Sequence, residues 1–297
     1  MTRRRRWTLF GSLALAACLA LLVGGTPQGR ALVKTTRGFA ILETDPHVRY
    51  EPAAEANAAR VAAVLGRSIE RVQGVHGTTF EESPTIFVCG TQGSFNEFLA
   101  QPGGRATGTV VLGRLLLSPR SFREGTYEAV LGHELSHLLL RRRRGWVSAV
   151  TEIPGWFHEG LAVFASGGGG GLPVTPEEAR RAIVAGRTFV PEDEGAWRPR
   201  MAADHGVPHH QFYRQSGLFV EFLARSHPEG FRAFLDAVHG GKGFRAAFET
   251  HMGRTVEVAW GEFVESVRSR RDGGGVEAGA VGIERFFAPR PRRRRSE

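Results

Sequence analysis

Residues 126–140 restrict the fold of this 297-residue chain more than any other segment. They are apolar around nearly the whole helical circumference, which predicts a helix buried on all sides. Two imidazoles and a carboxylate interrupt the apolar run, in the order His133-Glu134-Leu135-Ser136-His137. Burying such groups is costly unless they are paired or coordinated to a cation. The remaining chain must therefore cover this helix and also supply partners for its polar groups.

The two histidines stand four residues apart, so they lie on one face of the helix and can bind one metal ion. Glu134 lies beside them, where it can accept a proton from water on that ion without being a ligand. We therefore interpret His133 and His137 as ligands of one Zn2+ per chain, and Glu134 as the catalytic base.

A catalytic zinc ion usually has a third protein ligand and keeps its fourth position open. The candidate is Glu159, 22 residues after His137, on a helix expected over residues 154–165. Gly160 beside it would allow a close approach of two backbones. His158 is the alternative ligand, but the motif and its spacing favour Glu159.

The HExxH pattern followed by W-F-x-E-G-x-A at Trp156–Ala162 resembles the gluzincin metallopeptidases. Among these it is similar to the small peptidase-MA-like family, relatives of the thermolysin and aminopeptidase groups. The resemblance covers residues 39–268, including G-R-A-x-G at Gly104–Gly108 and a Tyr213–Gly217 segment that opens a helix. It implies zinc binding by His133, His137 and Glu159, with Glu134 as general base.

The chain also departs from this family. The interval between His137 and Glu159 is a few residues longer than in the thermolysin and aminopeptidase groups. Val163 stands where thermolysin-like enzymes have an acidic residue. The glycine motif of aminopeptidases is not evident, so aminopeptidase specificity is not implied. The extended pattern HExxHxxGxxH also fails, because Leu140 and Arg143 occupy its glycine and third histidine positions.

By the same resemblance, Tyr213 is a catalytic candidate that could donate a hydrogen bond to the tetrahedral oxyanion. His205, His209 and His210 cluster just before it and are further candidates. For Tyr213, an ordinary half-buried position on a helix is an equal alternative. For each histidine taken singly, a structural role is favoured.

Hydrophobic periodicity along the chain predicts an α+β fold. It would have a small mixed β-sheet with a helix in the N-terminal half, followed by a mostly helical C-terminal half. Strands are expected over residues 38–45, 85–89, 109–112 and 115–118. Helices are expected over residues 52–72, 94–99, 126–140, 154–165, 175–185, 212–225, 228–238, 244–250 and 256–270.

These elements would make one metallopeptidase domain over residues 31–271. Its α/β part would end near residue 122, and its active-site and helical part would cover residues 123–271. Five successive glycines, Gly167–Gly171, would form either a lid over a cleft or a tolerated insertion.

The N-terminus has the pattern of a targeting segment. Arg3–Arg6 precede the apolar run Trp7–Val23, so residues 1–30 are predicted to be a signal peptide or a membrane anchor. The positive-inside rule then predicts an exported chain, periplasmic or extracellular, or associated with the membrane through this segment. Cys18, after Leu15-Ala16-Ala17, is a weak candidate for lipidation. Cys89 lacks a disulfide partner if the segment is removed and is expected to be a small buried side chain.

The formal charge of +9 is concentrated at the two ends of the chain. Residues 1–6 carry +4 and residues 290–297 carry +4, which leaves +1 for residues 7–289. We therefore expect no nucleic-acid partner. Residues 272–297 are low in pattern and rich in Gly, Pro and Arg, and are expected to form a disordered tail.

Together these features predict a zinc-dependent hydrolase, specifically a peptidase acting on a peptide or protein substrate by Glu134-assisted attack of water. The alternative is a non-catalytic, zinc-containing binding module of the cell envelope with the same fold. The intact Glu134 favours the enzyme.

Overall fold

The computed structural model describes residues 30–31, 34–197 and 199–272. The predicted signal peptide or anchor, with Cys18, and the predicted tail lie outside these residues, except for Arg30 and Asp272 at their ends. Within the described part of the chain, no helix is both long and apolar enough to span a membrane. The chain divides into two compact units, residues up to 62 with 85–127, and residues 63–84 with those from 128 onward.

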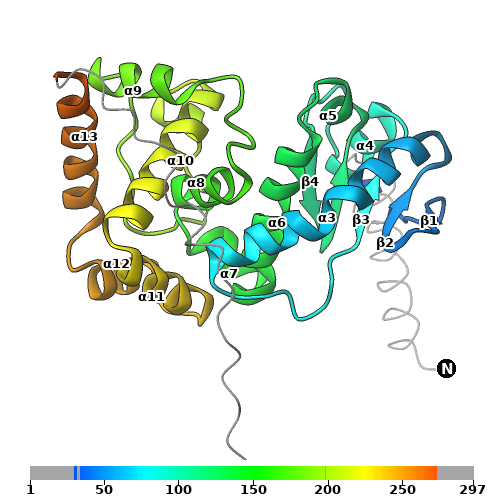
Figure 1. The fold of residues 1–297 in the computed structure, drawn as a ribbon, viewed down its shortest axis with the longest axis horizontal. Helices are drawn as coiled ribbons and strands as arrows, with labels where there is room; N and C mark the ends of the chain where they lie inside the picture. Colours follow the sequence, from blue (N-terminus) through cyan, green and yellow to red (C-terminus); the bar gives the residue numbers. More distant parts are fainter. Residues whose placement is uncertain (1–29, 32–33, 198, 273–297) are drawn as a thin grey trace, which may run out of the picture. The chain divides into compact units, whose positions relative to one another are not determined.

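The fold is α+β, as the sequence predicts: a small mixed sheet lies in the N-terminal half and helices dominate the C-terminal half (Figure 1). The five strands occur in the sheet in the order β1-β2-β3-β5-β4. Neighbours β2, β3 and β5 run parallel, whereas β1 and β4 are antiparallel to the strands beside them. The strands are β1 (Ala40–Leu42), β2 (Asp45–Tyr50), β3 (Ile86–Val88), β4 (Gly108–Val111) and β5 (Arg114–Leu117).

The strand expected over residues 38–45 is only partly correct. The chain turns after Leu42 and begins a second strand, β2, at Asp45. The sequence pattern missed β2 because proline is unfavourable inside a sheet. Here Pro46 is the second residue of the strand, where a missing N–H is more easily tolerated.

The first unit is organised around an apolar cluster that joins the sheet to α4 (Gln92–Leu99). The unit also contains η1 (Pro52–Ala54), the start of α3 (Glu55–His76) and the short helix α5 (Pro119–Arg123). Cys89 is free and fully buried, as expected. The cluster consists of Phe87, Cys89, Phe95, Phe98 and Leu116.

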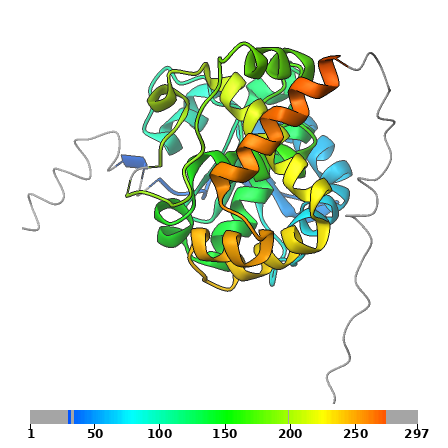
Figure 2. The same ribbon diagram turned by 90° about the vertical axis from the view of Figure 1, so that its left-hand side faces the viewer.

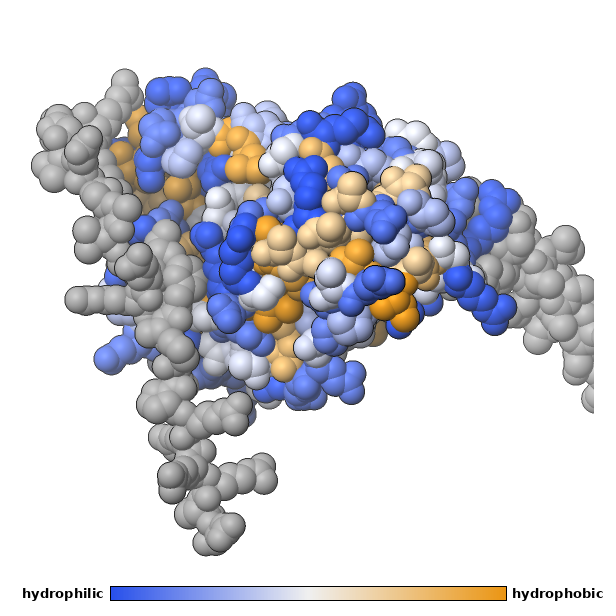
Figure 3. Space-filling view, turned by 45° about the vertical axis from the view of Figure 1, so that its right-hand side comes forward, coloured by the Kyte–Doolittle hydropathy of each residue, from blue (hydrophilic) through white to orange (hydrophobic). Residues whose placement is uncertain are grey.

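The face shown in Figure 3 is mostly hydrophilic, with smaller groups of apolar side chains between the charged ones. Two large apolar residues of the first unit, Ile41 and Leu112, have more than half of their surface exposed. Exposed apolar side chains of this kind are normal on protein surfaces and indicate no particular partner.

The second unit is helical and contains every residue proposed for the metal site. Figure 2 faces this unit and shows α13 lying in front of α10; α13 packs against both α9 and α10. Its helices are the end of α3, α6 (Tyr127–Arg144), α7 (Trp146–Thr151), α8 (Gly155–Ser166), α9 (Pro176–Val184), η2 (Ala202–His205), α10 (His209–Ser226), α11 (Pro228–His239), α12 (Phe244–Met252) and α13 (Val256–Asp272).

The core of the second unit is largely aromatic. α8 is buried at every position from Gly155 to Ala165, and it packs closely along α10. A helix that is apolar on all sides must be covered in this way. The fully buried aromatic residues of this unit include Trp156, Phe157, Phe189, Phe212, Phe219, Phe231, Phe234 and Phe248.

Candidate metal centre

α6 presents His133 and His137 on one face, as their spacing of one helical turn requires. The helix is fixed by burial, since Leu131, Leu135 and Leu138 have no exposed surface. It ends at Arg144, and the next residue, Gly145, has a positive φ of 92°. Both imidazoles are therefore carried by an element that cannot easily move within the core.

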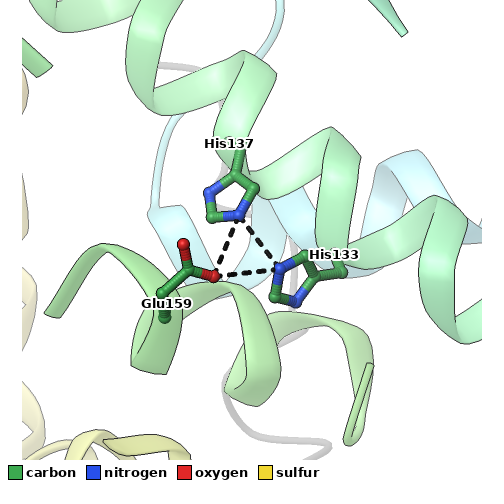
Figure 4. A group of neighbouring side chains, drawn as sticks. All are labelled: His133, His137 and Glu159. Atoms are coloured by element: carbon green, nitrogen blue, oxygen red, sulfur yellow. Dashed lines mark hydrogen bonds and ion pairs between the residues drawn. The ribbon is translucent and has the colours of Figure 1, made fainter. Parts of the chain in front are cut away.

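Glu159 projects from α8 toward these two histidines (Figure 4). His133 Nε2 lies 3.0 Å from His137 Nε2. Glu159 Oε2 lies 3.2 Å from His133 Nε2 and 3.3 Å from His137 Nε2. The three residues are only 5%, 6% and 8% exposed, so their polar atoms meet in a nearly dry environment. We call them the metal centre.

The separations within the metal centre fit a single bound ion. Ligand atoms about 2.0–2.1 Å from a tetrahedral zinc ion are about 3.3–3.4 Å apart, close to the three distances observed. Glu159 Oε2 is buried and accepts no hydrogen bond, although two imidazole nitrogens lie beside it. Such acceptor atoms repel one another unless a proton or a cation lies between them. These three side chains could therefore hold a metal ion.

The tautomer of His133 is set by the backbone. Its Nδ1 atom lies 3.0 Å from the carbonyl oxygen of Gly169. Because a carbonyl oxygen only accepts hydrogen bonds, Nδ1 carries the proton and a neutral imidazole then offers the Nε2 lone pair to a metal. By contrast, Nδ1 of His137 is buried and makes no hydrogen bond.

The protonation behaviour of the metal centre follows from burial and mutual contact. Burial alone would raise the pKa of Glu159, but His137, His133 and His158 outweigh it and hold that pKa well below its ordinary value. Burial lowers the pKa of His133, yet the Glu159 carboxylate reverses the shift, and the net change is upward. Burial lowers the pKa of His137 well below its ordinary value despite Glu159. Each of the three pKa values is therefore set by burial and by the other members of the centre.

Glu134 follows His133 on α6 and stays outside the cluster of ligand atoms. Burial raises its pKa to about 7, and Glu159 acts in the same direction, while His133 and Arg141 oppose the shift. A carboxyl group with such a pKa can exchange protons near neutral pH. Glu134 is thus not among the residues whose ligand atoms converge.

Tyr213, on α10, lies over the metal centre. Its ring stacks on that of His133, with centroids 5.9 Å apart and planes inclined by 15°. Burial raises the pKa of Tyr213 well above its ordinary value, and the nearby carboxylates of Glu159 and Glu134 act in the same direction. The phenol therefore stays protonated and remains a hydrogen-bond donor.

The three histidines before Tyr213 have different environments. His209 is the one whose ring packs on Tyr213, with centroids 4.3 Å apart. Nδ1 of His210 donates to the Gly170 carbonyl oxygen over 2.8 Å. His205 lies among Phe189 and Phe212, with Nε2 3.3 Å from Glu192 Oε1. His205 is therefore a packing residue and not part of the centre.

His158, the alternative ligand, does not reach the ligand position. Its ring stacks on His137 with centroids 4.3 Å apart. Its Nδ1 atom is 3.9 Å from Oε1 of Glu159, the oxygen that does not point at the other two ligands. The stack supports the orientation of His137.

Sequence reasoning missed a buried polar cluster that includes Ser136 of α6. His76 Nε2 lies 2.8 Å from Ser136 Oγ, and His76 Nδ1 lies 3.3 Å from His239 Nε2. These residues come from α3, α6 and α11, and His76 has no exposed surface. Ser136 inside the HExxH pattern was the available signal, but nothing local indicated its partners. The Gly169 carbonyl was likewise missed, because a backbone acceptor has no sequence signature.

No model of a known protein family matches this chain, and no curated protein sequence matches it either, so the geometry of the metal centre carries the functional argument.

Proposed function

We propose that this chain is a zinc-dependent hydrolase, specifically a peptidase of the gluzincin, peptidase-MA-like kind. The observation that carries the proposal is the triangle of His133 Nε2, His137 Nε2 and Glu159 Oε2, 3.0–3.3 Å on each side, with Glu134 next to it on α6. The motif resemblance supports the same reading.

Zinc is the metal that this donor set favours. Two imidazoles and one carboxylate form the protein part of many catalytic zinc sites, which leave one position for water or substrate. A purely structural site is usually closed by four ligands, commonly cysteines. Among the described residues, only these three groups converge in this way. When bound, zinc would supply Lewis-acid activation of water and of the substrate carbonyl.

The remaining steps belong to side chains of this chain. Glu134 accepts a proton from the attacking water and transfers it to the departing amine. Its burial raises the pKa of the carboxyl group and so makes it a better proton acceptor. Tyr213 donates its hydroxyl proton in a hydrogen bond to the oxyanion of the tetrahedral intermediate. The stacking of its ring on that of His133 keeps Tyr213 beside the metal centre. A peptide or protein is the substrate for which this set of groups is suited.

The decisive experiment combines metal analysis with hydrolysis of labelled casein and of a mixed library of quenched fluorescent peptides. The wild type should contain about one zinc per chain. Glu134→Gln should keep that zinc and lose at least about 100-fold in hydrolysis, because the base is gone while the ligands remain. Glu159→Ala should lose the zinc.

Glu128→Gln is the matched control, since Glu128 lies in the first turn of the same helix and pairs with Arg67 instead. It should keep both zinc and activity. Hydrolysis that survives in Glu134→Gln would refute the mechanism. Zinc without hydrolysis in the wild type would favour the binding module.

The arginine block and apolar run of residues 1–30 support a further part of the proposal, that the chain is exported or held at the membrane. Cell fractionation of the full chain beside a form lacking residues 1–30 tests this. The full chain should be found outside the cytoplasm or with the membrane, and the shortened form should stay in the cytoplasm. Equal cytoplasmic recovery of both would contradict it.

A further inference from the structure

The five-glycine segment, Gly167–Gly171, lies against the metal centre. Gly168, Gly169 and Gly171 are buried. The carbonyl oxygen of Gly169 accepts the hydrogen bond from His133 Nδ1. The sequence left open whether this segment is a lid or a tolerated insertion; in the structure it contacts His133, a proposed ligand. We call it the glycine loop.

The glycine loop begins as the C-terminal cap of α8, the helix that carries Glu159. Gly167 ends this helix with a left-handed φ of 73°, and Gly168 N donates to the Val163 carbonyl oxygen over 2.8 Å. Gly169 N then donates to Ser166 Oγ, also over 2.8 Å. α8 and the glycine loop are therefore continuous: α8 carries the Glu159 carboxylate, and the loop carries the carbonyl oxygen that accepts a hydrogen bond from His133 of α6.

The glycine loop leaves no room for side chains on the side that meets α6 and α10. A Cβ atom on Gly169 would collide with the carbonyl oxygen of Ala129 on α6. A Cβ atom on Gly170 would lie 2.7 Å from Cδ1 of Tyr213 and 3.0 Å from Cε1 of His133. Gly170 also has a φ of 78°, which disfavours other residues. Only glycine at these two positions therefore allows the loop to lie this close to α6 and α10.

The far side of the glycine loop is fastened to α10. His210 Nδ1 donates to the Gly170 carbonyl oxygen over 2.8 Å. Just after the loop, Arg214 Nε donates to the Val174 carbonyl oxygen, also over 2.8 Å. The loop is therefore bonded to the three helices that carry His133, Glu159 and Tyr213. These contacts hold the loop in one position although its glycine-rich sequence is flexible in isolation.

We propose that the glycine loop is the positioning element of the metal centre. The Gly169 carbonyl fixes the tautomer and ring orientation of His133, and the missing side chains at Gly169 and Gly170 let the loop reach it. A hydrogen bond from the outer nitrogen of a histidine ligand orients the ring and raises its basicity. His137 lacks such a bond, so the centre depends on the loop. This inference rests on metal binding in the proposed function, and is independent of hydrolysis.

The test compares zinc affinity of full-length Gly170→Ala and wild type by competition with a fluorescent chelator. Gly170→Ala should bind zinc about 10–100-fold more weakly, the usual effect of losing such a support. Gly186→Ala is the matched control. Gly186 has a similar φ of 74°, but a Cβ atom added there would have no atom within 4 Å. Alanine at Gly186 therefore causes the same backbone strain as at Gly170 without a collision. Its zinc affinity should equal that of the wild type.

A second measurement needs no folded variant. In zinc-loaded wild type with 15N-labelled histidine, the Nδ1 proton of His133 should exchange with water more slowly than that of His137. A metal bound through His133 Nδ1, or equal exchange at the two rings, would overturn the proposal. So would wild-type zinc affinity in Gly170→Ala, or equal weakening in both variants. Wild-type protein that binds no zinc would instead refute the metal site itself.

Discussion

Gly160→Ala should both destabilise the second unit and weaken the metal centre. Gly160 lies next to Glu159 on α8, where this helix crosses α10. A Cβ atom at this position would lie 2.6 Å from the carbonyl oxygen of Ser216 and 2.9 Å from Cγ2 of Val220. Across the same contact, Gly217 of α10 has no room for a side chain because of Val163. The added methyl group therefore meets the backbone of a packed helix and cannot be absorbed by a rotamer change.

The size of the effect follows from these distances. Carbon and oxygen atoms normally approach to roughly 3.5 Å, so the two helices must move apart by about 1 Å. Overpacking of this kind costs about 1–3 kcal/mol. The same shift moves the Glu159 carboxylate, although metal–ligand distances tolerate only about 0.2 Å. If about half of the strain reaches the centre, zinc affinity falls roughly tenfold, which corresponds to about 1.4 kcal/mol.

Urea unfolding gives the stability change, and chelator competition gives the zinc affinity. Gly66→Ala is the control, because Gly66 lies inside α3 and a Cβ atom added there would have no neighbouring atom within 4 Å. That variant should gain up to about 1 kcal/mol from helix propensity and keep its zinc affinity. If Gly160→Ala unfolds at the same or a higher urea concentration than the wild type, the close crossing of α8 and α10 is refuted.

Two further outcomes are expected. Burial lowers the pKa of His76 and His239, that of His239 to about 4 with help from Arg143 and Arg144. Because unfolded histidine takes up its proton near pH 6.5, the free energy of unfolding should fall as the pH drops from 6.5 to 4. His239 should account for on the order of 3 kcal/mol of this fall, and urea titrations of His239→Gln should show a correspondingly flatter pH dependence. The free energy of unfolding should be about 3 kcal/mol lower after zinc has been removed by chelation than in the presence of free zinc at a concentration 100 times its Kd. Thermal melts should show this difference in the wild type and not in Glu159→Ala; a difference that persists in the variant would place the zinc elsewhere.

Local sequence determined the elements whose signals are periodic. The apolar run through HExxH predicts α6, and the four-residue spacing alone places two imidazoles on one face, since a helix turns once in about 3.6 residues. Thr175 and Glu178 predict the start of α9, where each side chain accepts from the backbone N–H of the other residue. The α+β class follows from the same patterns and is confirmed.

Predictions from local sequence were less accurate where an element is short or where a proline interrupts its pattern. β2 was missed at Pro46, and α5 and α7 are too short to show a period. α10 begins at His209, three residues earlier than the pattern indicated, because Pro208 ends the preceding segment and the first turn is polar. Such boundaries depend on contacts with other elements more than on propensity.

Tertiary structure alone decided which polar groups meet. His158 and Glu159 are neighbours in sequence, yet Oε2 of Glu159 enters the triangle while His158 stacks behind His137. His205 and His209 are equally polar in sequence, yet His209 packs on Tyr213 and His205 is enclosed by aromatic rings. The Gly169 carbonyl, the acceptor for His133, has no side chain to reveal it. Spacing within one helix is set by its own hydrogen bonds, and sequence therefore shows it. Distances between helices are set by packing and loop closure, and only the folded chain contains them.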